Sequence, residues 1–143
     1  MTIQPTEKAT TTGPTPAQQD KYHGPTAVSP APVLTMAEYQ KRAQKTAIYP
    51  TAGKGHPNGI NYTVLGLLGE AGELANDWKK AVRDGDYALA KEKMRFELGD
   101  VLWYVALLAN ELGMDLNQVA NANLEKLQDR KSRNVLRGSG DKR

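Results

Sequence analysis

The sequence has no cysteine among its 143 residues, and it has only two histidines and one phenylalanine. The lack of cysteine excludes a disulfide framework and a zinc–thiolate site, and it is compatible with a reducing cytoplasm. No glycine-rich phosphate loop of the P-loop or dinucleotide type stands out, nor does a serine, cysteine or histidine nucleophile constellation. If the chain has a reactive site, the ligands that remain for it are oxygen atoms.

Long hydrophobic runs are also missing. The longest uncharged apolar run, residues 101–109, has nine residues, whereas a helix that crosses a bilayer needs about 20. No stretch resembles a signal peptide. We therefore expect a soluble cytoplasmic protein, and the length of the chain fits a single domain.

Proline and charge are spread unevenly. Residues 1–34 hold six of the eight prolines and seven threonines, so this segment has too little apolar surface to fold and is predicted to be disordered. The net charge is zero over residues 1–34 and +4 over residues 131–143, which leaves −1 for the centre. Residues 132–143 are therefore predicted to form a basic, flexible and solvated tail, and residues 35–131 the folded domain.

The pattern between these ends predicts an all-α domain of four main helices. A capping box begins at Thr35, turn residues occupy positions 84–86, and Gly113 can end a helix. The helices are expected at residues 35–46, 61–84, 87–111 and 115–130.

Two acidic pairs dominate the second and third predicted helices. Glu70 with Glu73, and Glu97 with Asp100, are each three residues apart, which puts both carboxylates of a pair on one helix surface. Neither glutamate of the first pair has a basic residue three or four positions away. Two such helices side by side could offer four carboxylates to a divalent cation, although a solvated acidic face remains an open alternative.

The surroundings of the pairs favour the cation. The third helix is apolar around so much of its circumference that Glu97 and Asp100 are expected to be partly desolvated, and buried charges need a partner. Gly66, Gly69 and Gly72 indicate close approach of another backbone, from the third helix or a second subunit. Carboxylates and water suit Mg²⁺, which would also hold a polyphosphate and activate a water.

Several polar residues could contact a ligand or have an ordinary structural role. Lys54 and His56 lie in the predicted loop at residues 49–59, where solvation is the simpler role. Asn123, Lys126 and Arg130 share a flank of the fourth helix. They could hold phosphate oxygens or act as partners of the helix dipole.

Three segments resemble one family. GLLGEAGELANDWKK, ELGDVLWYVALLANELG and NLEKLQDR, at these separations, are similar to the MazG-like nucleotide pyrophosphohydrolases of the all-α NTP pyrophosphatase superfamily. The resemblance covers about residues 36–131, with E-x-x-E, E-x-x-D, a following tryptophan and N-x-x-K in order. Many members begin the first motif with two adjacent glutamates, where this chain has Gly69, so the number of bound ions stays open.

The resemblance implies an Mg²⁺-dependent enzyme that cleaves (d)NTPs between the α and β phosphates to give the monophosphate and pyrophosphate. It also implies homodimers or homotetramers in which helices of two subunits complete a bundle. We expect no nucleic-acid partner. The family's catalytic Mg²⁺ carboxylates correspond to Glu70, Glu73, Glu97 and Asp100. Asn123 and Lys126 would face the phosphates, with Lys79, Lys80 and Arg130 as weaker candidates.

Two alternatives remain. One is a pyrophosphatase for a single substrate, such as dUTP, dCTP or phosphoribosyl-ATP, with base selectivity from aromatics such as Tyr49, Tyr62 or Trp78. The other is a non-catalytic helical oligomer that binds nucleic acid or a protein partner. The sequence does not decide which carboxylate acts as general base.

Overall fold

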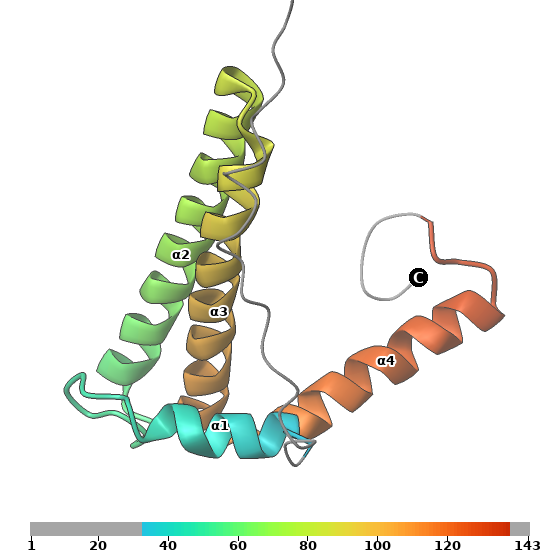
Figure 1. Cartoon of the computed structure of the whole chain (residues 1–143). Helices are drawn as coiled ribbons and strands as arrows, with labels where there is room; N and C mark the ends of the chain where they lie inside the picture. The colour runs from blue at the N-terminus through green and yellow to red at the C-terminus, as the bar shows by residue number, and fades with distance from the viewer. Residues whose placement is uncertain (1–32, 138–143) are drawn as a thin grey trace, which may run out of the picture. The chain divides into compact units, whose positions relative to one another are not determined.

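The computed structural model describes residues 33–137, and within them all regular structure is helical. The all-α prediction is therefore confirmed for this part of the chain. The predicted disordered segment lies outside the described residues except for its last two positions, as does the end of the basic tail. None of the described helices is both long and apolar enough to span a membrane. The helices in Figure 1 are α1 (Met36–Gln44), α2 (Pro57–Asp84), α3 (Tyr87–Glu111) and α4 (Leu116–Ser132).

Side-chain caps explain why three helices begin where the sequence predicts. The side chain of Thr35 accepts a hydrogen bond from the Glu38 N–H at 3.1 Å, and that of Asp86 accepts one from the Leu89 N–H at 3.0 Å. Asp115 caps α4 in the same way. Each cap satisfies an N–H that has no partner within its own helix.

The predicted start of the second helix was wrong by four or five residues. α2 begins at Pro57, because His56 Nδ1 accepts a hydrogen bond from the Asn58 N–H at 3.1 Å and proline fits the first helical turn. Histidine was not recognised as a cap, and Gly59 was assigned to the loop although it lies in the first turn of α2. His56 thus has a structural role at the end of the loop.

α2 and α3 pack against each other as an antiparallel pair. They approach closely at Gly66, where an added Cβ would lie 2.1 Å from Cε1 of Tyr104 on α3. The predicted close approach is therefore confirmed at this glycine. An added Cβ at Gly69 or Gly72 would meet nothing within 4 Å among the described residues, so α3 does not explain these two glycines.

Gly66→Ala should lower the free energy of unfolding by about 1–3 kcal/mol, the usual cost of overpacking, despite alanine's better helix propensity. The cost should largely disappear in a Tyr104→Leu background, because the ring that meets the new methyl group is gone. Urea denaturation of the four chains of this double-mutant cycle measures the coupling. Purely additive costs would contradict the close contact.

The core lies where α1, the following loop, the carboxyl-terminal half of α3 and the start of α4 meet. Leu107 is fully buried there. The Gln40 side chain ties α1 to the turn between α3 and α4 by donating to the Met114 carbonyl and accepting from the Leu116 N–H. The other buried apolar members of this core are Ala43, Tyr49, Ala106, Ala109 and Leu116.

The predicted burial of α3 holds only for this half of the helix. Phe96 and Leu98 in its other half are 57% and 56% exposed. The reason is that, among the described helices, α2 alone packs closely on that half. α4 packs on α1 rather than on α2 within residues 33–137, and it leaves Leu124 and Leu127 exposed.

Candidate active site

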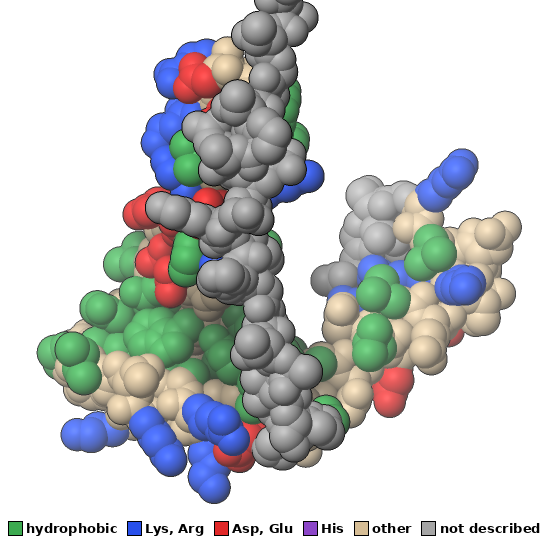
Figure 2. Space-filling model, viewed as in Figure 1, with side chains coloured by type: hydrophobic (Ala, Val, Ile, Leu, Met, Phe, Trp, Pro, Cys, Tyr) green, Lys and Arg blue, Asp and Glu red, His purple; other side chains and the backbone are tan. Residues whose placement is uncertain are grey.

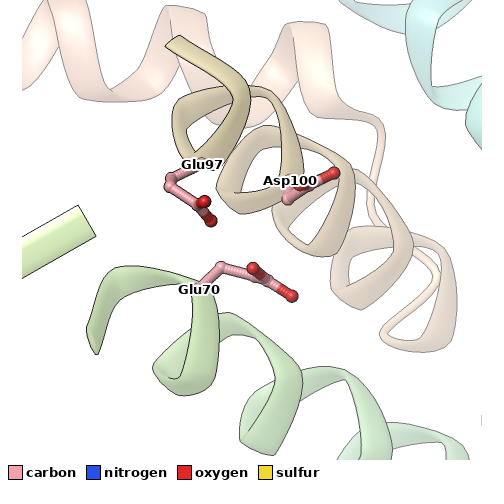
Figure 3. A group of neighbouring side chains, drawn as sticks. All are labelled: Glu70, Glu97 and Asp100. Carbon is pink, nitrogen blue, oxygen red and sulfur yellow. The ribbon is translucent and has the colours of Figure 1, made fainter. Parts of the chain in front are cut away.

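Carboxylates from two helices converge between α2 and α3. Figure 3 shows Glu70 of α2 beside Glu97 and Asp100 of α3, and one oxygen of each lies within 4.8 Å of the others. The spacing of three residues puts both α3 acids on one face. Glu70 and Glu97 are partly buried, whereas Asp100 is exposed. Partial desolvation is therefore confirmed for Glu97 but not for Asp100.

Glu73 is exposed and lies outside this group of three. Its charge still acts on the group: burial first, and then the charges of Asp100, Glu73 and Glu97, raise the pKa of Glu70. The four predicted carboxylates therefore interact electrostatically, with Glu70 at the centre.

The chemistry of this donor set fits a hard divalent cation. All its ligand atoms are carboxylate oxygens, and among the described residues Glu70, Glu97 and Asp100 take part in no ion pair. Like charges this close repel one another, and a cation between them would convert the repulsion into attraction. Oxygen ligands of this kind are those that Mg²⁺ prefers.

Lys79 and Lys80 are exposed on α2, roughly two turns beyond Glu73. Lys80 Nζ lies 3.7 Å from Asp77 Oδ1. The Asp77 side chain is only 13% exposed, but that of Lys80 is 47% exposed and can turn toward another anion. Both lysines remain candidates for phosphate contacts.

The candidates on α4 are not brought to the acids within one chain. Asn123 and Lys126 are exposed, and Arg130 is only 5% exposed. Because α4 packs on α1, the structure does not place these three side chains beside the α2–α3 carboxylates. Their assignment as phosphate ligands stays a prediction.

Three tyrosines form a cluster, and Tyr104 is the member nearest the acidic group. The rings of Tyr49 and Tyr62 are stacked, with centroids 4.5 Å apart, and Tyr104 lies 6.4 Å from Tyr62. Burial, then Tyr62, and then the charges of Glu70 and Asp100 raise the pKa of Tyr104, which places its hydroxyl within electrostatic range of the acids. Figure 2 shows hydrophobic side chains gathered directly beside acidic ones on this face.

Trp78 belongs to a different part of the α2–α3 pair. Its ring contacts Tyr87, at 5.7 Å between centroids, close to the turn that joins the two helices. Of the three aromatic candidates for base selectivity, Tyr62 is thus the exposed ring that contacts Tyr104 beside the acids, and Tyr49 is buried behind it.

Sequence reasoning missed Glu111, the last residue of α3. Its side chain is buried, and Oε1 accepts hydrogen bonds from the Tyr49 hydroxyl at 2.6 Å and the Gly53 N–H at 2.7 Å. Oε2 accepts from the Gly55 N–H at 3.0 Å. The partners lie 56 to 62 residues away in sequence, so no local pattern could identify them.

These bonds decide the charge of Glu111. Burial alone would raise its pKa, but hydrogen bonds from Tyr49 and from the backbone of Gly53, Gly55 and Lys54 outweigh burial and lower the pKa. Burial, followed by the bond to Glu111, raises the pKa of Tyr49. The pair therefore consists of a carboxylate and a neutral phenol, which together hold the loop between α1 and α2.

Comparisons with known proteins gave two matches. The family model of the MazG nucleotide pyrophosphohydrolase domain matches residues 59–135. The Gene 37 protein of Mycobacterium phage L5 is 51% identical over 109 residues, which cover 73% of this chain and 96% of the phage protein. No solved structure gave a significant match. The chain therefore belongs to the MazG nucleotide pyrophosphohydrolase family and is a hydrolase that acts on acid anhydrides.

Proposed function

We propose that this enzyme hydrolyses nucleoside triphosphates between the α and β phosphates, with Mg²⁺ as cofactor, to give the monophosphate and pyrophosphate. The observation that carries the proposal is the convergence of Glu70, Glu97 and Asp100 within 4.8 Å. A purely structural surface has no need of three acids that repel one another without a basic partner.

The roles of the chain's own residues follow from their positions. Glu70, Glu97 and Asp100 would hold the ion, which supplies charge neutralisation at the phosphates and lowers the pKa of water. Exposed Glu73 borders this group and can accept a proton from the attacking water. Among the four acids, Glu73 is thus the one that geometry leaves free for a general base.

Phosphate contacts are proposed for Lys79 and Lys80 from the same chain. Asn123, Lys126 and Arg130 would act in the assembly, reaching the acids of another copy, since α4 packs away from α2. A chain with Glu97→Gln mixed with a chain with Lys126→Ala should then regain part of the activity. Failure of refolded mixtures to exceed either variant alone would place Lys126 outside a shared site.

A homo-oligomer is also proposed, because large apolar side chains stay exposed on the α2–α3 pair. Leu65, Leu68 and Phe96 are 68%, 65% and 57% exposed, and the open positions Gly69 and Gly72 would let another backbone approach. Sedimentation equilibrium should give a dimer or a tetramer. A monomer at micromolar concentration would contradict this part of the proposal.

A panel of nucleotides tests the activity. The four dNTPs and four NTPs, together with dUTP and phosphoribosyl-ATP, are incubated with and without Mg²⁺, and the products are separated by anion-exchange chromatography. The expected products are a monophosphate and pyrophosphate, with no turnover after EDTA treatment. Inorganic phosphate with a diphosphate product would contradict α–β cleavage, and turnover of one substrate alone would support the specific pyrophosphatase.

We propose the cytoplasm as the location, since nucleoside triphosphates are found there.

Glu70→Gln should stabilise the metal-free protein at pH 7 by on the order of 1 kcal/mol, because it removes repulsion from the neighbouring carboxylates. The pKa of Glu70 is higher in the folded chain than in the unfolded chain. Ionisation of Glu70 therefore destabilises the folded state, and this effect develops as the pH rises from the pKa of the unfolded chain to that of the folded chain. The advantage of the variant should therefore vanish below about pH 4. Mg²⁺ should raise the Tm of the wild type and leave that of Glu70→Gln nearly unchanged. A lower Tm for the variant at pH 7 without metal would contradict the repulsion.

A further inference from the structure

Tyr62 offers a half-exposed ring that its neighbours hold firmly. The ring is 46% exposed. Tyr49 stacks against it with 17° between the ring planes, and Tyr104 from α3 contacts it at a tilted angle. Such a ring can offer a flat, pre-oriented apolar face, which is what an aromatic ligand needs to stack on.

This ring lies on the same side of α2 as the acids. Tyr62, Gly66 and Glu70 follow one another at intervals of four residues, which is about 6 Å of rise each. The Tyr104 ring fills the space left by the missing side chain of Gly66, between the other two positions. A ligand that lay over the Tyr104 ring could contact the acids at one end and the Tyr62 ring at the other.

Glu111 determines where the supporting Tyr49 ring lies. Its carboxylate binds the Tyr49 hydroxyl and the N–H groups of Gly53 and Gly55. The Glu111 carboxylate is also packed tightly against α2, because a Cβ at Gly59 would lie 2.8 Å from its carboxylate carbon. A change at Glu111 should therefore be transmitted through Tyr49 to Tyr62.

We propose that Tyr62 is the face on which the nucleoside part of the substrate stacks, and that Glu111 is a positioning residue that sets this face through Tyr49. The inference rests on the proposed function for the acids. A nucleoside triphosphate has its phosphates at one end and an aromatic base at the other, which matches acids and ring on one side of α2. Trp78, the other exposed aromatic candidate, packs against Tyr87 at a tilted angle and has no stacked ring beside it within residues 33–137.

Equilibrium binding to the full chain tests this proposal. Titration calorimetry with Mg²⁺ compares the α,β-methylene analogues of the four deoxynucleoside triphosphates, which resist cleavage, with inorganic tripolyphosphate, which has no base. Tyr62→Leu should raise the Kd of the best analogue by about tenfold or more, the usual effect of losing one stacked base, and leave the Kd of tripolyphosphate unchanged. Tyr62→Trp should keep the wild-type preference, and Trp78→Leu should leave both constants unchanged.

Glu111→Gln and Tyr49→Phe should raise the Kd of the same analogue, measured well below the Tm of each variant. Leu116→Ala is the matched control, since it removes a core side chain that is 3% exposed at the start of α4. It should lower the Tm without changing the analogue's Kd. If Glu111→Gln changes the Kd no more than Leu116→Ala does, Glu111 is merely structural and the positioning role is overturned.

The outcomes also separate this proposal from the proposed activity. A wild type that releases pyrophosphate, with a Tyr62→Leu chain that binds the analogue as tightly, overturns the stacking face alone. A wild type that binds the analogue through Tyr62 but hydrolyses no nucleotide overturns the activity alone. If Tyr62→Leu weakens the binding of the analogue and of tripolyphosphate by the same factor, the stacking face is also overturned.

Discussion

Asp100→Asn and Glu97→Gln should each reduce kcat/KM for pyrophosphate release by about 100-fold or more. Both side chains share the carboxylate group with Glu70, and each change keeps the shape of the side chain while removing one negative charge. A divalent ion contributes several kcal/mol to charge stabilisation, and each 1.4 kcal/mol or so corresponds to a factor of ten in rate. Weaker metal retention should therefore reduce activity by two orders of magnitude or more.

Glu92→Gln is the matched control for these variants, since Glu92 is exposed on α3 and lies outside the acidic group. It should keep near wild-type kinetics. Steady-state rates over a range of Mg²⁺ concentrations measure the effect, because a weakened metal site should be partly rescued by more metal. Undiminished activity in both Glu73→Gln and Asp100→Asn would remove the proposed site.

The acidic group could be predicted because the residues that define it lie close together in the sequence of each helix. The spacing within each pair fixes a shared helix face. Neither Glu70 nor Glu73 has a basic residue three or four positions away, so the charges of this pair need a partner elsewhere. That Glu70 faces Glu97 and Asp100 depends on the pairing of α2 with α3. The glycines predicted packing against either the third helix or a second subunit, and the structure shows the pairing with α3. The exposure of Asp100 was not predictable, because it depends on which helices cover α3.

Other features depend on contacts that no short segment contains. The start of α2 was missed because a histidine acts as its cap, although serine, threonine, aspartate and asparagine are the usual ones. Glu111 resembled an ordinary helix-terminal acid, and its partners lie across the loop between α1 and α2. The packing of α4 on α1 decides that Asn123 and Lys126 lie away from the acids, and helical periodicity cannot reveal the partner of an apolar face.

Glu111→Ala should have the largest effect on stability, a loss of about 3–5 kcal/mol in the free energy of unfolding. The substitution leaves the Tyr49 hydroxyl and the N–H groups of Gly53 and Gly55 without their acceptor, and each unsatisfied buried donor costs about 1–3 kcal/mol. Tyr49→Phe removes a single donor and should cost only about 1 kcal/mol. Urea unfolding of both chains compares the costs, and equal losses would contradict a carboxylate with several partners.

The pH dependence of stability gives an independent test of the same carboxylate. Because the pKa of Glu111 is lowered in the folded protein, its stabilisation is complete above the unfolded pKa of about 4.3 and is lost as pH falls through the folded value. The wild type should therefore lose stability below about pH 4.5 more steeply than Glu111→Gln, whose amide does not titrate in this range. The pKa of Glu70 is raised, so its ionisation changes the stability in the opposite direction. The wild-type residue and Gln at position 111 are therefore compared in chains that also have Glu70→Gln. Parallel pH profiles for the two chains there would show that Glu111 is not held as a charged group.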